Sequence, residues 1–83
     1  MTENEYQEHL VKILRTEEGF CNVYKYLSEA FSKCNTNAPK KIIRNDLALA
    51  VIALYKIGEV LNININEGVE LISNEMKKEN KND

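Results

Sequence analysis

The sequence predicts an all-α fold, a small antiparallel four-helix bundle with a long central third helix. Pro occurs once and Gly three times in 83 residues, which favours helices over a turn-rich β fold. Apolar residues recur at helical spacing along the chain. Residues 47–54 are eight consecutive apolar residues within the longest predicted helix. A surface helix of a bundle needs only one apolar stripe. We therefore expect this segment to be the central helix or to face another chain in part.

Two helices are predicted before residue 35. Thr2 and Glu5 have the spacing of a capping box, which predicts the start of the first helix. Gly19 predicts a break after it, and the second helix then runs from Phe20 to Cys34. The apolar stripes of the two helices are Tyr6, Leu10, Ile13 and Leu14, then Phe20, Val23, Tyr24, Leu27, Phe31 and Cys34.

The third helix is predicted from about Pro39 to Leu61. Asn37 is the expected cap, and Pro39 suits a first helical turn because its missing N–H costs nothing there. Gly58 lies inside this helix and costs about 1 kcal/mol relative to Ala, which a close helix crossing could compensate. The predicted core comprises Leu10, Ile13, Leu14, Phe20, Tyr24, Leu27, Phe31, Ile43, Leu47, Val51, Leu54, Leu61, Val69 and Ile72.

The fourth helix is predicted from about Ile65 to Lys78. Residues 62–66 alternate Asn and Ile, but Asn is depleted in strands, so we interpret them as a connection. Asn64 and Glu67 offer a second capping box. Residues 1–76 are expected to form one helical domain, and residues 77–83, which lack apolar side chains, a disordered polar tail.

Composition favours a cytoplasmic protein. Formal net charge is −2, so no basic footprint for nucleic acid covers the whole domain. No apolar run approaches the roughly 20 residues of a transmembrane helix, and the acidic start of the chain is not a signal peptide. Cys21 and Cys34 are expected on different helical faces, which argues against an intrachain disulfide and fits a reducing compartment.

No motif for catalysis or cofactor binding is present. His9 has no Cys or Asp at ligand spacing, and we predict no catalytic, cofactor-binding or metal-binding residues. Whether the chain is an enzyme is left open, leaning towards no. Asp46, just before the apolar run, is predicted to accept a hydrogen bond at one end of the bundle or to join a polar site there.

Two surfaces of the third helix are candidates for binding. The predicted interaction surface comprises Ile42, Leu49, Ile52, Ala53 and Tyr55, rimmed by Lys41 and Lys56. Lys40, Lys41 and Arg44 form a basic cluster where positive charge opposes the helix dipole. They are a possible anion-binding site.

From Asp46 onward, the order of residues resembles the last two helices of MazG-like nucleoside-triphosphate pyrophosphohydrolases. The resemblance rests on the connection Leu61-Asn62-Ile63-Asn64-Ile65-Asn66-Glu67-Gly68-Val69 after an apolar helix. It implies an all-α, dimer-forming scaffold and magnesium-dependent hydrolysis. Asp46 and Leu49 stand at the positions of the family's Glu-x-x-Asp pair, so a leucine replaces the second carboxylate. Glu17-Glu18-Gly19-Phe20-Cys21 matches its Glu-Glu-x-x-Glu, with Cys21 in place of the third acid.

Three functions follow from these features. The leading hypothesis is a non-enzymatic helical module that self-associates through the third helix, as a dimer, and binds a protein partner. It would regulate or inhibit a larger protein, and its small size and Asn/Lys/Ile-rich composition suggest a mobile-element origin. The second is a MazG-like hydrolase relative with a degenerate Mg²⁺ site. The third is a regulator that binds nucleic acid weakly.

Overall fold

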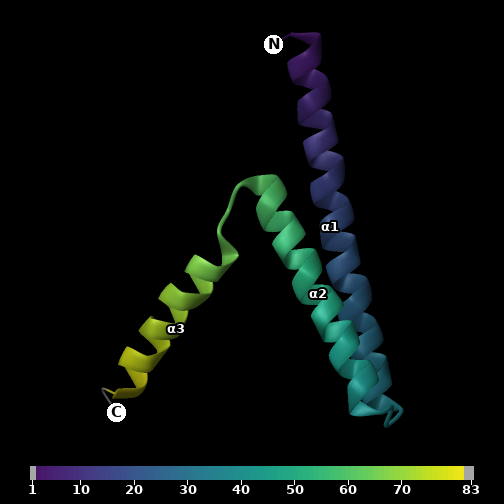
Figure 1. Cartoon of the computed structure of the whole chain (residues 1–83), viewed down its shortest axis with the longest axis vertical. Coiled ribbons are helices and arrows are strands. Elements are labelled where there is room, and N and C mark those ends of the chain that lie inside the picture. Colours follow the sequence, from purple (N-terminus) through teal and green to yellow (C-terminus); the bar gives the residue numbers. More distant parts are fainter. Residues whose placement is uncertain (1, 82–83) are drawn as a thin grey trace.

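Three helices make up the part of the chain that the computed structural model describes, residues 2–81. They are α1 (Glu3–Asn35), α2 (Lys40–Leu61) and α3 (Ile65–Lys81), and no strand occurs in those residues (Figure 1). The all-α class is therefore confirmed. The four-helix bundle is wrong, because the first two predicted helices are one continuous helix.

Gly19 accounts for the expectation of two separate helices before residue 35. It lies inside the 33-residue α1, where a Cβ atom would stand 2.5 Å from Cγ1 of Ile57. The glycine therefore allows α2 to approach closely and does not end a helix. At the start of α1 the predicted capping box is present: the Glu5 amide donates to Thr2 Oγ1 over 3.3 Å, and the Thr2 amide donates to Glu5 Oε2 over 3.4 Å.

The ends of α2 differ from the prediction in detail. Pro39 occupies the N-cap position with no side-chain cap, and Asn37 instead adopts a left-handed conformation, with φ of 56°, in the turn after α1. At the other end, Asn62 has φ of 57°, and the Ile63 amide donates to the Gly58 carbonyl over 2.8 Å. A Cβ on Gly58 would lie 2.9 Å from the Ile63 carbonyl oxygen. This glycine accommodates the turn after α2.

The α3 helix begins at Ile65, where the sequence predicts the start of the fourth helix. The Glu67 amide donates to Asn64 Oδ1 over 3.1 Å, which is one half of the expected capping box. The predicted tail, residues 77–83, overlaps α3, which is helical to Lys81. Residues 82 and 83 lie outside the described residues.

An antiparallel hairpin of α1 and α2 holds the only buried apolar cluster of residues 2–81. The cluster comprises Val23, Ala53 and Ile57, and Ala30 and Ala50 are also buried. The α3 helix contacts α2 near their connection and diverges from it (Figure 1). Thus α2 is central, as predicted, but α1 is the longest helix. Most of the predicted core is exposed within one chain, although Leu61 packs partly buried against the cluster. Phe31 is 69% exposed and Tyr24 70%, because these large side chains face away from the helix pair.

The three helices lie in one layer. The backbone measures 52 × 39 × 15 Å, and Figure 1 views the molecule down its shortest axis. Its radius of gyration is 17.4 Å, against about 12 Å for a compact domain of this length. Domains normally bury apolar faces between two packed layers. Both broad faces of this layer are therefore left open.

Candidate interaction surfaces

An ion pair joins the hairpin near its closed end. Lys33 Nζ lies 2.5 Å from Asp46 Oδ2, and the Asp46 side chain is 8% exposed. Asp46 thus accepts a hydrogen bond at one end of the helix pair, as the sequence predicts. The pair places residue 33 of α1 level with residue 46 of α2, while Gly19 stands opposite Ile57 at the other end. These two contacts fix the register of the hairpin.

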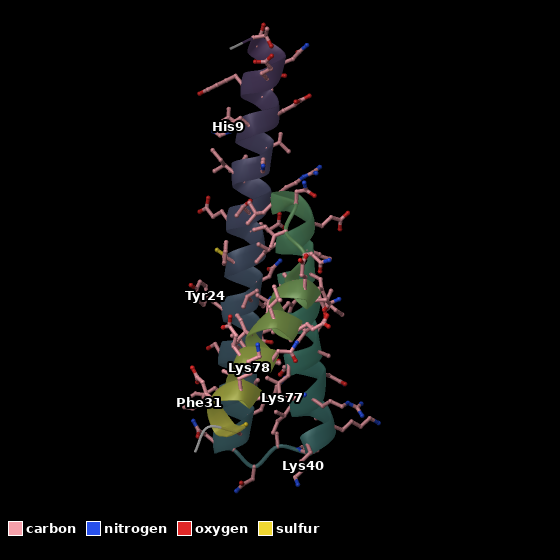
Figure 2. The ribbon with its side chains drawn as sticks, turned by 90° about the vertical axis from the view of Figure 1, so that its left-hand side faces the viewer. His9, Tyr24, Phe31, Lys40, Lys77 and Lys78 are labelled. Carbon is pink, nitrogen blue, oxygen red and sulfur yellow. The ribbon has the colours of Figure 1, made fainter. Side chains whose placement is uncertain are left out.

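One broad face of the hairpin is apolar on both helices. An open crevice of about 400 Å³ has Ile13 and Phe20 of α1 and Leu61 of α2 as its apolar lining, and its other lining residues are His9, Lys12, Thr16 and Glu17 of α1. Residues seven apart share a helical face, so Leu27 continues the α1 row and Leu54 and Leu47 continue the α2 row. Tyr24 and Phe31 project from the same side of α1 (Figure 2). We call this surface face A: Ile13, Phe20, Tyr24, Leu27, Phe31, Leu47, Val51, Leu54 and Leu61.

Along α1, the exposed apolar residues follow alternating steps of four and three. Tyr6, Leu10, Ile13, Phe20, Tyr24, Leu27 and Phe31 keep this spacing, with Glu17 at the one interrupted step, and each is at least 41% exposed. This is the spacing of a coiled-coil seam. The seam does not face α2, which packs instead against Gly19, Val23 and Ala30. The α1 helix therefore has one face for α2 and a second for another helix.

The opposite broad face carries most of the interaction surface that the sequence predicts. A second crevice, between the helices, is lined by Lys56 with Arg15, Glu18 and Asn22. Lys56, Leu49 and Ile42 are seven residues apart and share this side. We call the surface face B: Ile42, Leu49, Ile52 and Lys56. Its apolar members are 40–50% exposed, and the side chains of α1 that line the crevice are polar except for Val11.

The other predicted surface residues lie elsewhere. Ala53 is 5% exposed because it packs against α1, so its place in the predicted surface is corrected. Tyr55 is exposed on the α3 side of α2, where its hydroxyl donates to Asn66 Oδ1 over 2.8 Å. Lys41 is exposed in the first turn of α2.

The basic cluster is open to solvent. Lys40, Lys41 and Arg44 are all exposed, and Arg44 Nη2 donates to the neighbouring Asn45 Oδ1 over 3.2 Å. No carboxylate lies within ion-pair distance of these three side chains among residues 2–81. Anion binding by them stays a prediction.

The carboxylates do not gather into a metal site. Within residues 2–81, no three His, Cys, Asp or Glu side chains lie close enough to hold one ion. A Mg²⁺ ion needs several oxygens placed around it. Asp46 is held by Lys33, and Leu49 follows it where the resemblance expects a second acid. These residues do not fit the magnesium site that the resemblance implies, so we derive no chemistry through it.

Comparison with protein-family models, with curated proteins and with solved structures finds no match to the chain. Within the described residues, no single helix combines the length and the hydrophobicity needed to cross a membrane. A span could be made only by α2 and α3 together, and these are bent by 111° at their connection.

Proposed function

We propose that this chain is a non-enzymatic helical interaction module that self-associates through α2 and binds a protein partner, as a regulator or inhibitor of a larger protein. One observation carries the proposal, the amount of surface left uncovered. The chain exposes 7168 Å², whereas a compact monomer of 9.6 kDa exposes about 5,100 Å². The difference, about 2,000 Å², exceeds the roughly 800 Å² that each partner buries in a standard interface.

The small core supports the same proposal. Of the five buried apolar residues, three are alanines, and the other two are Val23 and Ile57. Burying a large apolar side chain contributes about 1.5–3 kcal/mol, and most of the large side chains of residues 2–81 are exposed. Ordering each residue costs at least about 1 kcal/mol. We therefore expect the helices to be stable only when another chain covers their apolar faces.

Sedimentation equilibrium of the whole chain tests self-association. We expect a mass of twice 9.6 kDa at micromolar concentration, and thermal unfolding midpoints that rise with protein concentration, because association stabilises by mass action. A single-chain mass up to millimolar concentration, with a midpoint independent of concentration, would contradict self-association. Binding of a partner is tested separately, by determining the mass of the complex captured from the native cell.

Two assays address the other functions. Magnesium-dependent release of pyrophosphate from a panel of nucleoside triphosphates, lost in Asp46→Asn, would support the hydrolase. Affinity for nucleic acid that falls steeply with salt and is lost when Lys40, Lys41 and Arg44 are replaced would support the nucleic-acid-binding regulator. We expect neither result, because Asp46 is already paired with Lys33 and the basic cluster holds only three residues.

A further inference from the structure

We propose that face A is the surface on which a second copy of this chain packs, antiparallel to the first, so that two hairpins form a four-helix bundle. The proposal rests on the proposed self-association and names its orientation and its surface, to which α2 contributes Leu47, Val51, Leu54 and Leu61 alongside α1, in place of the Ile42, Leu49 and Ile52 that the sequence predicts. It leaves face B, whose apolar strip on α2 is bordered by polar residues of α1, open for a protein partner.

Face A has the shape and the spacing that another pair of helices requires. The seam on α1 places Phe20, Leu27 and Phe31 at steps of seven and four, the spacing at which side chains insert between those of a facing helix. On α2, Leu47 and Leu54 extend the apolar surface by a second row. A partner must therefore be apolar over two adjacent helices, and a second copy presents such a face.

The contrast between the two faces assigns the second copy to face A. On face B, α1 contributes Arg15, Glu18 and Asn22 to the crevice beside Lys56. Two copies packed through face B would bury these polar groups, which is costly unless each finds a partner. On face A, Ile13, Phe20 and Leu61 line the crevice together with His9, Lys12, Thr16 and Glu17, but the rows that continue from it along both helices are apolar. The larger apolar area of face A makes it the better interface for two identical chains.

Charges at the two ends of face A determine the orientation. Glu17 lines the crevice beside Leu61 at one end of the hairpin. Lys40 begins the row that continues through Leu47 and Leu54 to Leu61, so it stands at the other end, where Figure 2 places it. In a parallel pair, α1 of one chain would lie over α2 of the other, so Glu17 would meet the Leu61 end of α2 and find no Lys40 there. In an antiparallel pair, Glu17 of each chain lies near Lys40 of the other, which gives two attractive contacts.

Two adjacent residues of α2 provide a matched test of the face. Val51 belongs to face A and Ile52 to face B, and their exposed fractions are similar, 46% and 50%. Val51→Asp places one carboxylate from each chain in the interface, two in every dimer. We therefore expect the dissociation constant to rise at least about 100-fold. Ile52→Asp should leave it within about threefold of the parent. Circular dichroism accompanies both measurements, because loss of helix that occurs only together with loss of the dimer is expected for a coupled fold.

Equal effects of the two variants, or a larger effect of Ile52→Asp, would overturn the assignment to face A while self-association itself still held. A monomeric parent would instead refute the proposed self-association.

Orientation is tested by Glu17→Lys and Lys40→Glu. Each alone should weaken the dimer about three- to tenfold, and the double variant should restore it, since surface ion pairs are individually weak. Two single variants without effect, or no restoration in the double variant, would contradict the antiparallel arrangement.

Discussion

Replacing Gly19 with alanine tests the helix crossing on which the hairpin depends. The new Cβ would stand 2.5 Å from Cγ1 of Ile57 and 3.3 Å from its Cδ1, whereas carbon atoms pack best at about 3.5–4.0 Å. Ile57 is 6% exposed, so it cannot turn outward to make room. Such overpacking costs about 1–3 kcal/mol, and the better helix propensity of alanine returns about 1 kcal/mol. We expect Gly19→Ala to lower the free energy of unfolding by up to about 2 kcal/mol.

Gly68 provides the matched control. It lies in α3 and would have no atom within 4 Å of an added Cβ, so Gly68→Ala should be stabilising by up to about 1 kcal/mol. Urea unfolding followed by circular dichroism, at one protein concentration, measures both variants. In an Ile57→Ala background the obstruction is removed, and Gly19→Ala should become stabilising, as a double-mutant cycle would report. If Gly19→Ala stabilises the parent chain as much as Gly68→Ala does, the close crossing is absent and our description of the hairpin fails.

Three further predictions concern polar contacts. Lys33→Met leaves the Asp46 carboxylate, whose side chain is 8% exposed, without its cation. We expect the free energy of urea unfolding to fall by about 1–3 kcal/mol, between the values for exposed and buried ion pairs. An unchanged free energy of unfolding would show that the pair is not formed. Asn62→Ala places alanine at φ of 57° and should cost about 1 kcal/mol in thermal unfolding, whereas Asn62→Gly should be neutral or stabilising; equal midpoints for the two would refute the left-handed turn. Tyr55→Phe removes a 2.8 Å hydrogen bond and should lower the free energy of unfolding by no more than about 1 kcal/mol. Amide hydrogen exchange in the first turn of α3 should become faster. An unchanged exchange rate there would count against the contact with Asn66.

The sequence contained the evidence for one long α1, although Gly19 was interpreted as a break. Ile13 and Phe20 are seven residues apart and continue a single apolar row across the glycine. Separate helices would not be expected to preserve this register. The rule that glycine interrupts helices therefore conflicts here with the periodicity, and the periodicity is the stronger signal. The contact between Gly19 and Ile57, by contrast, depends on tertiary packing that local spacing does not report.

The sequence identified which residues are apolar but not which neighbour covers them. The helical spacing of Phe31 and Tyr24 predicts that they lie in the core, yet Ala50 and Ala53 occupy the helix interface. Small residues permit close approach between two helices, so the pair buries its alanines and directs its large side chains outward. For the same reason, Ala53 was wrongly placed on the exposed surface with Ile52. Periodicity defines a face of a helix, but the choice of partner for each face is a property of the assembled fold.

The apolar residues all around the middle of α2 support the proposal that this helix has neighbours beyond its own chain. One packed neighbour requires an apolar stripe at least about 100° wide. In α2, Ala50 and Ala53 face α1, Val51 lies on face A, and Ile52 lies on face B. Three such stripes occupy most of the circumference, which leaves no room for charge between residues 47 and 54. A helix packed against α1 alone would have tolerated charge at residues 51 and 52. The continuous apolar run is therefore what the proposed function requires of α2, on which this helix would contact its own chain, a second copy and a further protein.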